Sequence, residues 1–381
     1  MTAIPVKGAV LEWARKFRGL SENDAAEKLG IAIADLDDFE NERKQPSLTQ
    51  FENFAAQYRL PQATLFLQTP PSTPNPPVDF RSIEGRRAQV HSFDFNVALS
   101  DIRGLLFQIE KISAEDEEFT PPPLPQLTLK NDPALEGERE RRRIGISVDE
   151  QLGWKSSKGF SNWRTALEKQ GILVFQAKFP VSDGRGFTLY ENADTPTIIV
   201  NKEDTSDAAK SFTIWHEYAH LLLRQPGVSD LKFSNPTEAF CNRFAAAFLI
   251  PTDALRALLP VWPNSPVEWK DSEIKWWASR LKVSQRALAI RLEQLGIAPK
   301  DFGDRFSWGP PKKRQKKEGG DQIATHLSEI GFTFTERILS ALDRGIIDQV
   351  AAVEALGLGN DHLQRARDYV SRRRERVAVE S

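Results

Sequence analysis

The feature that most restricts the fold of this chain is the pentapeptide His216-Glu217-Tyr218-Ala219-His220, an HExxH pattern. Two histidines four residues apart lie on one face of a helix and can direct ring nitrogens at a single ion. Glu217 then lies beside the first histidine, where its carboxylate can reach a metal-bound water. The residues on both sides are uncharged and include no proline or glycine, as a half-buried helix requires. The pattern therefore predicts a buried helix that binds a metal.

Two histidines make an incomplete metal site, because catalytic zinc usually has three protein ligands and leaves the fourth position to water. Glu238 lies 18 residues beyond His220 on the next expected helix, with Asn242 one turn further on the same face. This pair suits a ligand and a polar group that orients a ligand histidine. Glu238 equally suits a first-turn acidic residue favoured by the helix dipole. Spacing alone leaves both interpretations open.

A small sheet is expected directly before these two helices in the chain. Residues 172–175 have the pattern of a short buried strand, whereas 186–190 and 197–200 resemble a hairpin joined through 191–194. Helices are expected over 208–224 and 236–250. The fold class predicted from these patterns is α+β and mostly helical.

Length and composition predict more than one folding unit, because 381 residues is two to three times a typical domain. Helical periodicity returns over 93–118, and the charged stretch 136–144 is expected to be a solvated helical face. Residues 273–295 have the pattern of two short helices joined by a turn, as in a helix-turn-helix, with a basic, outward face that includes Arg286 and Arg291. The expected organisation is a helix-turn-helix bundle over 1–69, a proline-rich linker over 70–90, the α+β core with helical additions over 91–300, a basic linker over 301–320 and a helical domain over 321–381.

Charge and hydropathy exclude several classes of protein. The 51 basic and 53 acidic residues leave a net charge of −2, whereas a protein coated by nucleic acid is strongly basic. No apolar run is long enough to cross a bilayer, and the N-terminus lacks the apolar core of a signal peptide. The single cysteine, Cys241, cannot form an internal disulfide. We therefore expect a cytoplasmic chain that does not enter a membrane.

Two segments resemble a known family. Residues 212–220 have the form FTxxHExxH, and residues 238–251 have the form E-x-x-C-N-x-F-A-A closed by Leu-Ile-Pro. They are similar to the ImmA/IrrE family of metallopeptidases, closely over 170–255 and loosely over the whole chain, since a longer branch carries an N-terminal Cro/repressor-type helix-turn-helix. The resemblance implies a zincin-like domain in which Glu238 is the third metal ligand. It also implies a cytosolic endopeptidase, often one that cleaves a DNA-binding repressor.

Cys241 departs from the family pattern, which usually has alanine at this position. A cysteine three residues after Glu238 can approach the metal. We interpret it instead as a small buried hydrophobic residue, the commoner role of a lone buried cysteine.

The ligand set predicts a mechanism with one zinc ion, and manganese also suits a mixed histidine and carboxylate site. Such zinc lowers the pKa of its bound water towards about 7. Glu217 would take the proton of that water and deliver it to the leaving amine. Tyr190 and Arg185 are candidate donors to the oxyanion, although surface packing explains both equally well. Residues 187–190 could form an edge strand that captures an extended substrate.

The alternative function is a helix-turn-helix regulator or antitoxin whose peptidase fold serves as a sensor or scaffold. The expected partner of the enzyme is a protein substrate, a repressor with its own helix-turn-helix. In the N-terminal domain, the helix expected over 34–41 carries four carboxylates, which oppose the phosphate attraction that dominates DNA affinity. We therefore rank protein docking, either self-association as a homodimer or capture of a repressor, above DNA binding. The basic residues left for weak DNA contact are Arg15, Lys16, Arg18, Arg43 and Lys44.

Overall fold

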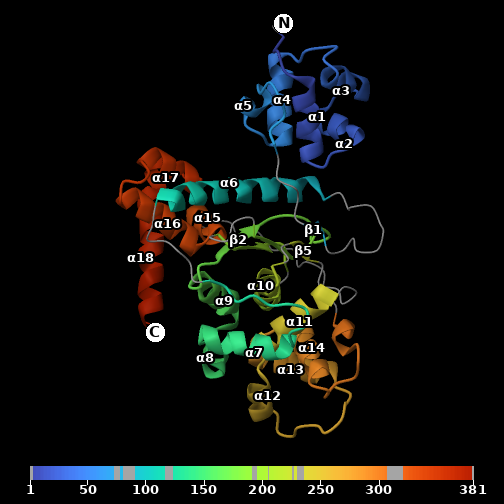
Figure 1. The fold of residues 1–381 in the computed structure, drawn as a ribbon, viewed down its shortest axis with the longest axis vertical. Helices are drawn as coiled ribbons and strands as arrows, with labels where there is room; N and C mark the ends of the chain where they lie inside the picture. Colours follow the sequence, from blue (N-terminus) through green and yellow to red (C-terminus); the bar gives the residue numbers. More distant parts are fainter. Residues whose placement is uncertain are drawn as a thin grey trace. The chain divides into compact units, whose positions relative to one another are not determined.

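The computed structural model describes residues 3–72, 78–79, 91–115, 123–190, 195–204, 206–224, 227–229, 236–306 and 321–379. The chain is mostly helical and α+β, as predicted (Figure 1). It divides into two compact units. Unit 1 comprises 1–76, 87–103 and 178–183, and unit 2 comprises 77–86, 104–177 and 184–381. The turn expected over 191–194 and most of the two expected linkers lie outside the described residues.

Unit 1 contains a bundle of short helices whose ends follow local capping rules. The Ser21 side chain accepts a hydrogen bond from the Asp24 amide, and Gly30 ends the same helix in the left-handed conformation at φ 67°. Val10, Leu36 and Phe54 are among the residues that fill its core. Its helices are α1 (Gly8–Phe17), α2 (Glu22–Leu29), α3 (Ile33–Glu40), α4 (Leu48–Tyr58), α5 (Gln62–Leu65) and the first half of α6 (Phe93–Glu115).

Unit 2 is built on a sheet of strand order β1-β5-β3-β4-β2. The predicted hairpin pairing is confirmed, because β3 (Gly186–Leu189) runs antiparallel to β4 (Thr197–Asn201). On the other side of β4, β2 (Leu173–Ala177) pairs in parallel. The two short strands are β1 (Val78–Asp79) and β5 (Gly227–Ser229).

The expectation that residues 187–190 form an edge strand is wrong for the first part of β3. Strand β5 pairs antiparallel with β3, with Gly186 opposite Ser229 and Phe187 opposite Val228. The backbone of β3 is therefore engaged on both sides at these two residues and cannot accept an added substrate strand there.

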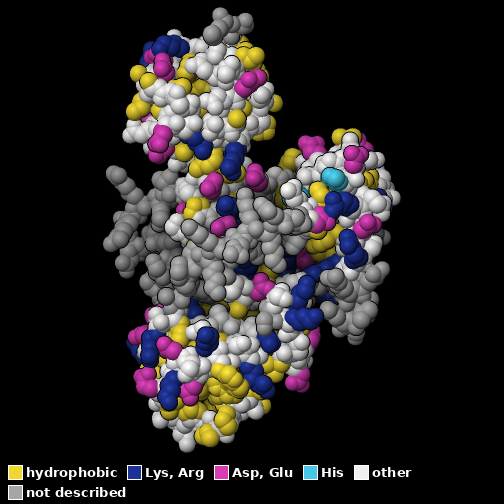
Figure 2. Space-filling view, turned by 180° about the vertical axis from the view of Figure 1, so that it is seen from behind, with side chains coloured by type: hydrophobic (Ala, Val, Ile, Leu, Met, Phe, Trp, Pro, Cys, Tyr) yellow, Lys and Arg dark blue, Asp and Glu magenta, His cyan; other side chains and the backbone are white. Residues whose placement is uncertain are grey.

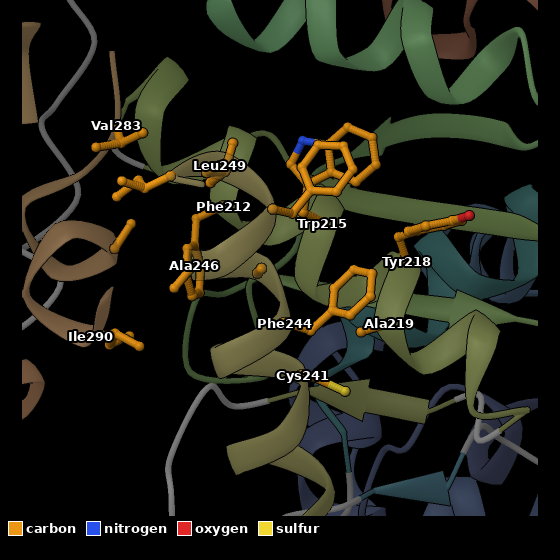
Figure 3. Packing of buried hydrophobic residues seen from close by; sticks show 14 of the residues in the cluster. Phe212, Trp215, Tyr218, Ala219, Cys241, Phe244, Ala246, Leu249, Val283 and Ile290 are labelled. Carbon is orange, nitrogen blue, oxygen red and sulfur yellow. The ribbon is translucent and has the colours of Figure 1, made fainter. Parts of the chain in front are cut away.

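Two buried helices follow β4, as predicted, and β5 lies between them in the chain. Helix α10 (Asp207–Leu222) begins at Ser206, whose side chain accepts a hydrogen bond from the Ala209 amide. Helix α11 (Pro236–Leu249) packs against it. Their apolar side chains form one cluster (Figure 3). In this cluster Trp215 stacks on Phe248 with ring centroids 3.6 Å apart. The HExxH pattern therefore lies inside the core of unit 2.

Helix α7 (Pro133–Ile144) lies directly on α11. A Cβ atom at Gly137 would stand 2.5 Å from the Phe244 carbonyl oxygen, so only glycine permits this approach. The expectation that residues 136–144 form a solvated face is wrong for Arg141, which is 3% exposed. Its guanidinium donates to the carbonyls of Ile146, Ser147 and Phe248. Arg141 therefore anchors α7 to the core.

The basic residues of 273–295 are also partly internal. Arg291 is 1% exposed and donates to the Ile250 carbonyl at 2.8 Å, while Arg286 is 9% exposed. These two side chains therefore do not form part of an outward basic face. The surrounding elements are α8 (Val148–Gly153), η2 (Ser156–Lys158), α9 (Gly159–Glu168), α12 (Thr252–Leu258), α13 (Asp271–Leu281), α14 (Gln285–Gln294) and η3 (Phe302–Arg305).

The C-terminal helices belong to unit 2 and dock on β2 and α9. Phe334 packs edge-on against Phe175, with ring centroids 5.5 Å apart, and Glu329 pairs with Lys202 at 2.8 Å. These elements are α15 (Gln322–Ile330), α16 (Phe332–Asp343), α17 (Gln349–Leu356), η4 (Asn360–His362) and α18 (Leu363–Val379). Within the part of the chain that the structure describes, no helix has both the length and the apolar character needed to cross a membrane.

Candidate metal centre

Helices α10 and α11 bring three potential metal ligands together. Glu238 reaches both histidines, with one carboxylate oxygen 3.1 Å from His216 Nε2 and the other 3.2 Å from His220 Nε2. The two Nε2 atoms are 3.2 Å apart. Ligand atoms around a tetrahedral zinc ion, with bonds of about 2.0–2.1 Å, lie roughly 3.4 Å apart. The spacing of these three side chains therefore fits a single ion.

The charges of this group also suit a metal. Burial lowers the pKa of His216, although Glu238 acts in the opposite direction. Burial alone would raise the pKa of Glu238, but attraction to the two histidines outweighs it and holds the pKa below its usual range. A neutral imidazole and an ionised carboxylate are the forms that bind a metal. The donor set is chemically consistent with a divalent cation.

Asn242 and Glu217 both lie beside His216. Asn242 Oδ1 lies 3.1 Å from His216 Nδ1, on the opposite side of the ring from Glu238. An Nδ1–H donated to this oxygen leaves the Nε2 lone pair of His216 available to a metal. Glu217, the next residue after His216, is fully buried.

Cys241 also approaches the ligand nitrogens. Its Sγ atom and one ring nitrogen each of His216 and His220 all lie within 4.8 Å of one another. Burial, together with the carboxylates of Glu238 and Glu217, raises the pKa of the thiol. Cys241 also belongs to the apolar cluster between α10 and α11 (Figure 3). The described residues thus contain a buried His–His–Cys group that could bind a metal ion.

Helix α10 is held in place by contacts that the sequence did not reveal. The Tyr218 hydroxyl donates to Glu140 on α7 at 2.7 Å and accepts from Arg143 at 2.8 Å. On the adjoining face, Trp163 of α9 packs edge-on against Trp215 at 5.5 Å. Trp215 and Tyr218 flank the pair His216-Glu217 in the sequence, so these contacts restrict the position of that pair. In the sequence, the only indication of these contacts was the arginine-rich stretch 136–144, which has the pattern of a solvent-exposed helical face.

Gly186 places β3 against the candidate general base. A Cβ atom at this position would stand 2.8 Å from both the Ile199 carbonyl oxygen and Thr213 Cγ2, and 3.1 Å from Glu217 Cγ. Such distances are too short for any other residue without a shift of the backbone. The absence of a side chain at Gly186 therefore lets the sheet lie against Glu217.

The two candidate oxyanion donors have other partners. The Arg185 guanidinium forms a salt bridge with Asp204, whose second oxygen lies 3.4 Å from Thr213 Oγ1. The Tyr190 ring is half-buried and lies under the Arg224 guanidinium, 4.7 Å from the ring centroid. Both residues flank β3, and their role as donors stays a prediction.

The basic residues proposed for DNA contact are engaged within unit 1. Arg15 is 5% exposed and pairs with Glu40 at 2.7 Å, and Arg18 is 1% exposed and donates to the Tyr58 and Arg59 carbonyls at 2.7 Å. Neither guanidinium is accessible to a DNA phosphate. The exposed residues are paired with carboxylates: Lys16 with Glu12, Arg43 with Asp37 and Asp38, and Lys44 with Asp35 and Asp38.

Two packed helices that carry an HExxH pattern and a facing carboxylate characterise a metallopeptidase-type domain. Consistent with this class, residues 167–293 match the family model Peptidase_M78, described as an IrrE N-terminal-like domain. The match spans about a third of the chain and contains β2, β3, β4, α10 and α11. It supports the family resemblance and a general protease activity. Neither a curated protein nor a solved structure matched the chain.

Proposed function

We propose that this chain is a zinc-dependent endopeptidase of the cytoplasm that cleaves a protein substrate, a DNA-binding repressor with its own helix-turn-helix. The observation that carries the proposal is the convergence of His216, His220 and Glu238 within 3.2 Å beside the buried Glu217. The family match over this segment supports it. Cleavage of a repressor would couple the enzyme to a stress response, a mobile element or a toxin–antitoxin pair.

In the proposed mechanism His216, His220 and Glu238 hold one zinc ion, and Asn242 keeps the His216 ring in its metal-binding tautomer. When bound, zinc supplies a Lewis acid that polarises a peptide carbonyl and lowers the pKa of water. Glu217 accepts the proton of the attacking water and returns it to the leaving amine. Manganese would satisfy the same histidine and carboxylate donors, so zinc is proposed on the family resemblance.

A regulator or antitoxin with a closed metal site is the second candidate. His216, Glu217 and His220 are 0% exposed and Glu238 is 3% exposed, and Cys241 stands close enough to act as a fourth donor. Zinc sites with four protein ligands are structural, whereas catalytic sites keep one position open. In that case the peptidase-type domain would be a scaffold or sensor.

For the N-terminal bundle we propose a helix-turn-helix domain that docks protein. It would do so by self-association as a homodimer or by capture of a repressor's similar domain. The carboxylates around Arg43 and Lys44 support this choice, because they neutralise the cations that a DNA backbone would need.

The decisive experiment compares the wild-type protein with Glu217→Gln. Both proteins are expected to contain one equivalent of zinc, because the substituted group is not a ligand. Only cells that express the wild type under stress or induction should produce new protein termini in a proteomic comparison. His216→Ala is the matched control and should lose the metal as well as cleavage. Wild-type protein that holds no transition metal after zinc is supplied, or equal termini with both proteins, would contradict the proposal.

A further inference from the structure

A hollow of about 550 Å³ lies in unit 2, on residues that the metal centre does not use. It is formed by α8, η2, α9 and the residues just after α9, and Arg373 of α18 also lines it. Cavities of about 300–1,000 Å³ are the usual size of small-molecule sites. The hollow is therefore large enough for an organic ligand.

The lining of the hollow carries an excess of positive charge. Lys155, Lys158, Lys169 and Arg373 provide four cations and Glu150 one carboxylate, a balance of +3 in a chain of net charge −2. Within the described residues none of the three lysines forms an ion pair. Figure 2 shows lysine and arginine side chains gathered in the region of α9 and α18. Like charges held around one hollow repel each other, and an anionic ligand would relieve this repulsion.

Arg373 is fixed in place, unlike an ordinary surface arginine. Its guanidinium donates to Ser161 Oγ at 3.0 Å and to Thr165 Oγ1 at 2.6 Å, both on α9. A guanidinium that is already oriented binds phosphate with a smaller loss of side-chain entropy. Hydroxyl and amide groups on the same wall can complete the hydrogen bonding of a phosphate.

The wall also offers an aromatic surface. Trp154 lines the hollow, is half-buried, and packs edge-on against Trp163 with ring centroids 4.7 Å apart. A flat ring can lie against such an indole, and apolar side chains of Ile144 and Ile146 lie on the same lining. Cations and an aromatic surface together suit a ligand with phosphate groups and a ring system.

Two chains of contacts lead from the hollow to the HExxH helix. Trp154 packs on Trp163, which packs on Trp215, the residue before His216. Gln170 accepts a hydrogen bond from Arg143 at 2.6 Å, and Arg143 donates to the Tyr218 hydroxyl of the motif at 2.8 Å. A ligand bound in the hollow would therefore act, through these contacts, on Trp215 and Tyr218, the residues on either side of His216-Glu217.

We propose that this hollow is a binding site for an organic phosphate with a flat ring, such as a nucleotide, and that its occupancy is transmitted to α10. The inference is independent of the proposed peptidase activity, because it rests on none of the metal-centre residues. Arg373 makes α18 part of the site, so the C-terminal helices would take part in ligand sensing.

Isothermal titration of the full chain with ATP, pyrophosphate and adenosine tests the proposal. We expect one saturable ATP site with a Kd on the order of 10–100 µM, weaker pyrophosphate binding because the ring contact is lost, and no adenosine binding. Lys155→Ala/Lys158→Ala should weaken ATP binding at least about 10-fold. ATP should also change the tryptophan fluorescence, and Trp154→Phe should reduce that change.

Lys130→Ala/Lys300→Ala is the matched control, since it removes the same charge from exposed lysines outside the hollow. It should leave the ATP affinity within about 2-fold of wild type, where only weak screened attraction is lost. The His216→Ala protein should still bind ATP, which separates this site from the metal centre. Absence of saturable binding, an equal loss in both double variants, or loss of binding in His216→Ala would each overturn the proposal.

Discussion

At the scale of single residues, the state of Cys241, coordinated or not, determines which of the two candidate functions the metal centre can support. Its sulfur lies within 4.8 Å of a ring nitrogen of each ligand histidine, yet the residue also fills apolar space between α10 and α11. A thiolate ligand would give four protein donors and close the site, whereas an uncoordinated thiol leaves a position for water. The endopeptidase proposal requires the second arrangement.

Cobalt substitution distinguishes these two arrangements. We expect the cobalt-loaded wild type to show the visible bands of a bound ion without a thiolate-to-cobalt charge-transfer band in the near ultraviolet. Cys241→Ala, which installs the residue usual in the family, should keep one metal ion and change its affinity by less than about 10-fold, the lower end of the effect of a group around the ligands. A near-ultraviolet band that disappears in Cys241→Ala would show that the thiolate is a ligand and favour the scaffold function.

At the scale of elements, the packing of strand β3 against helix α10 depends on one close approach, at Gly186. At Gly186 an added methyl group would meet the Ile199 carbonyl oxygen and Thr213, each at 2.8 Å, and Glu217 Cγ at 3.1 Å. We therefore expect Gly186→Ala to lower the free energy of unfolding by about 1–3 kcal/mol, the usual cost of overpacking. It should also reduce proteolysis more than its stability loss explains, because Glu217 is displaced.

Gly159→Ala is the matched control for this substitution. Gly159 begins α9 with helical dihedral angles, and its added methyl group would lie 3.8 Å from Ser211 Oγ, an ordinary contact. Alanine at a compatible helical position stabilises by about 0.4–1 kcal/mol. Denaturant unfolding of the two variants should therefore give changes of opposite sign. Equal stabilities would contradict the close packing of β3 on α10.

The polar link between α7 and α10 shows why helical charge patterns mislead. Arg141 and Glu140 lie in a run that is rich in charge, and such runs usually face solvent. Here Arg141 satisfies three main-chain carbonyls, and Glu140 receives the Tyr218 hydroxyl. Phe248 lies 107 residues from Arg141 and Tyr218 lies 78 residues from Glu140, so no local pattern could indicate these two contacts.

The whole molecule is expected to bind DNA only weakly. Arg15 and Arg18 are buried, and Arg43 and Lys44 face carboxylates, so few cations of the N-terminal bundle remain for DNA phosphates. Fluorescence anisotropy of the full chain with random and operator-like duplexes should give a Kd no tighter than about 10⁻⁶ M, the non-specific range.

Asp37→Asn/Asp38→Asn is the informative variant for this prediction. It removes the partners of Arg43 and should tighten DNA binding and steepen its dependence on salt, because freed cations displace counterions. Sequence-selective binding by the wild type tighter than about 10⁻⁷ M would show that the inference from charge pairing is wrong.

The local elements of both units could be predicted from the sequence. The helices expected over 208–224 and 236–250 match the observed bounds of α10 and α11 to within about two residues, and the helix between Ser21 and Gly30 begins and ends at its capping residues. Hairpin pairing of β3 with β4 followed from alternating strand and turn residues. Caps, periodicity and turns act between neighbours in the chain, so they are visible in the sequence.

The HExxH spacing by itself determined that His216 and His220 would share one helix face, because the helical repeat dictates it. Only the tertiary structure decided that Glu238 faces both rings, that Cys241 lies beside them, and that β5 covers the start of β3. It also decided that Arg141, Arg291 and Arg18 are internal. These outcomes depend on which surfaces meet when the helices and strands pack. A side chain's own neighbours in the sequence do not carry that information.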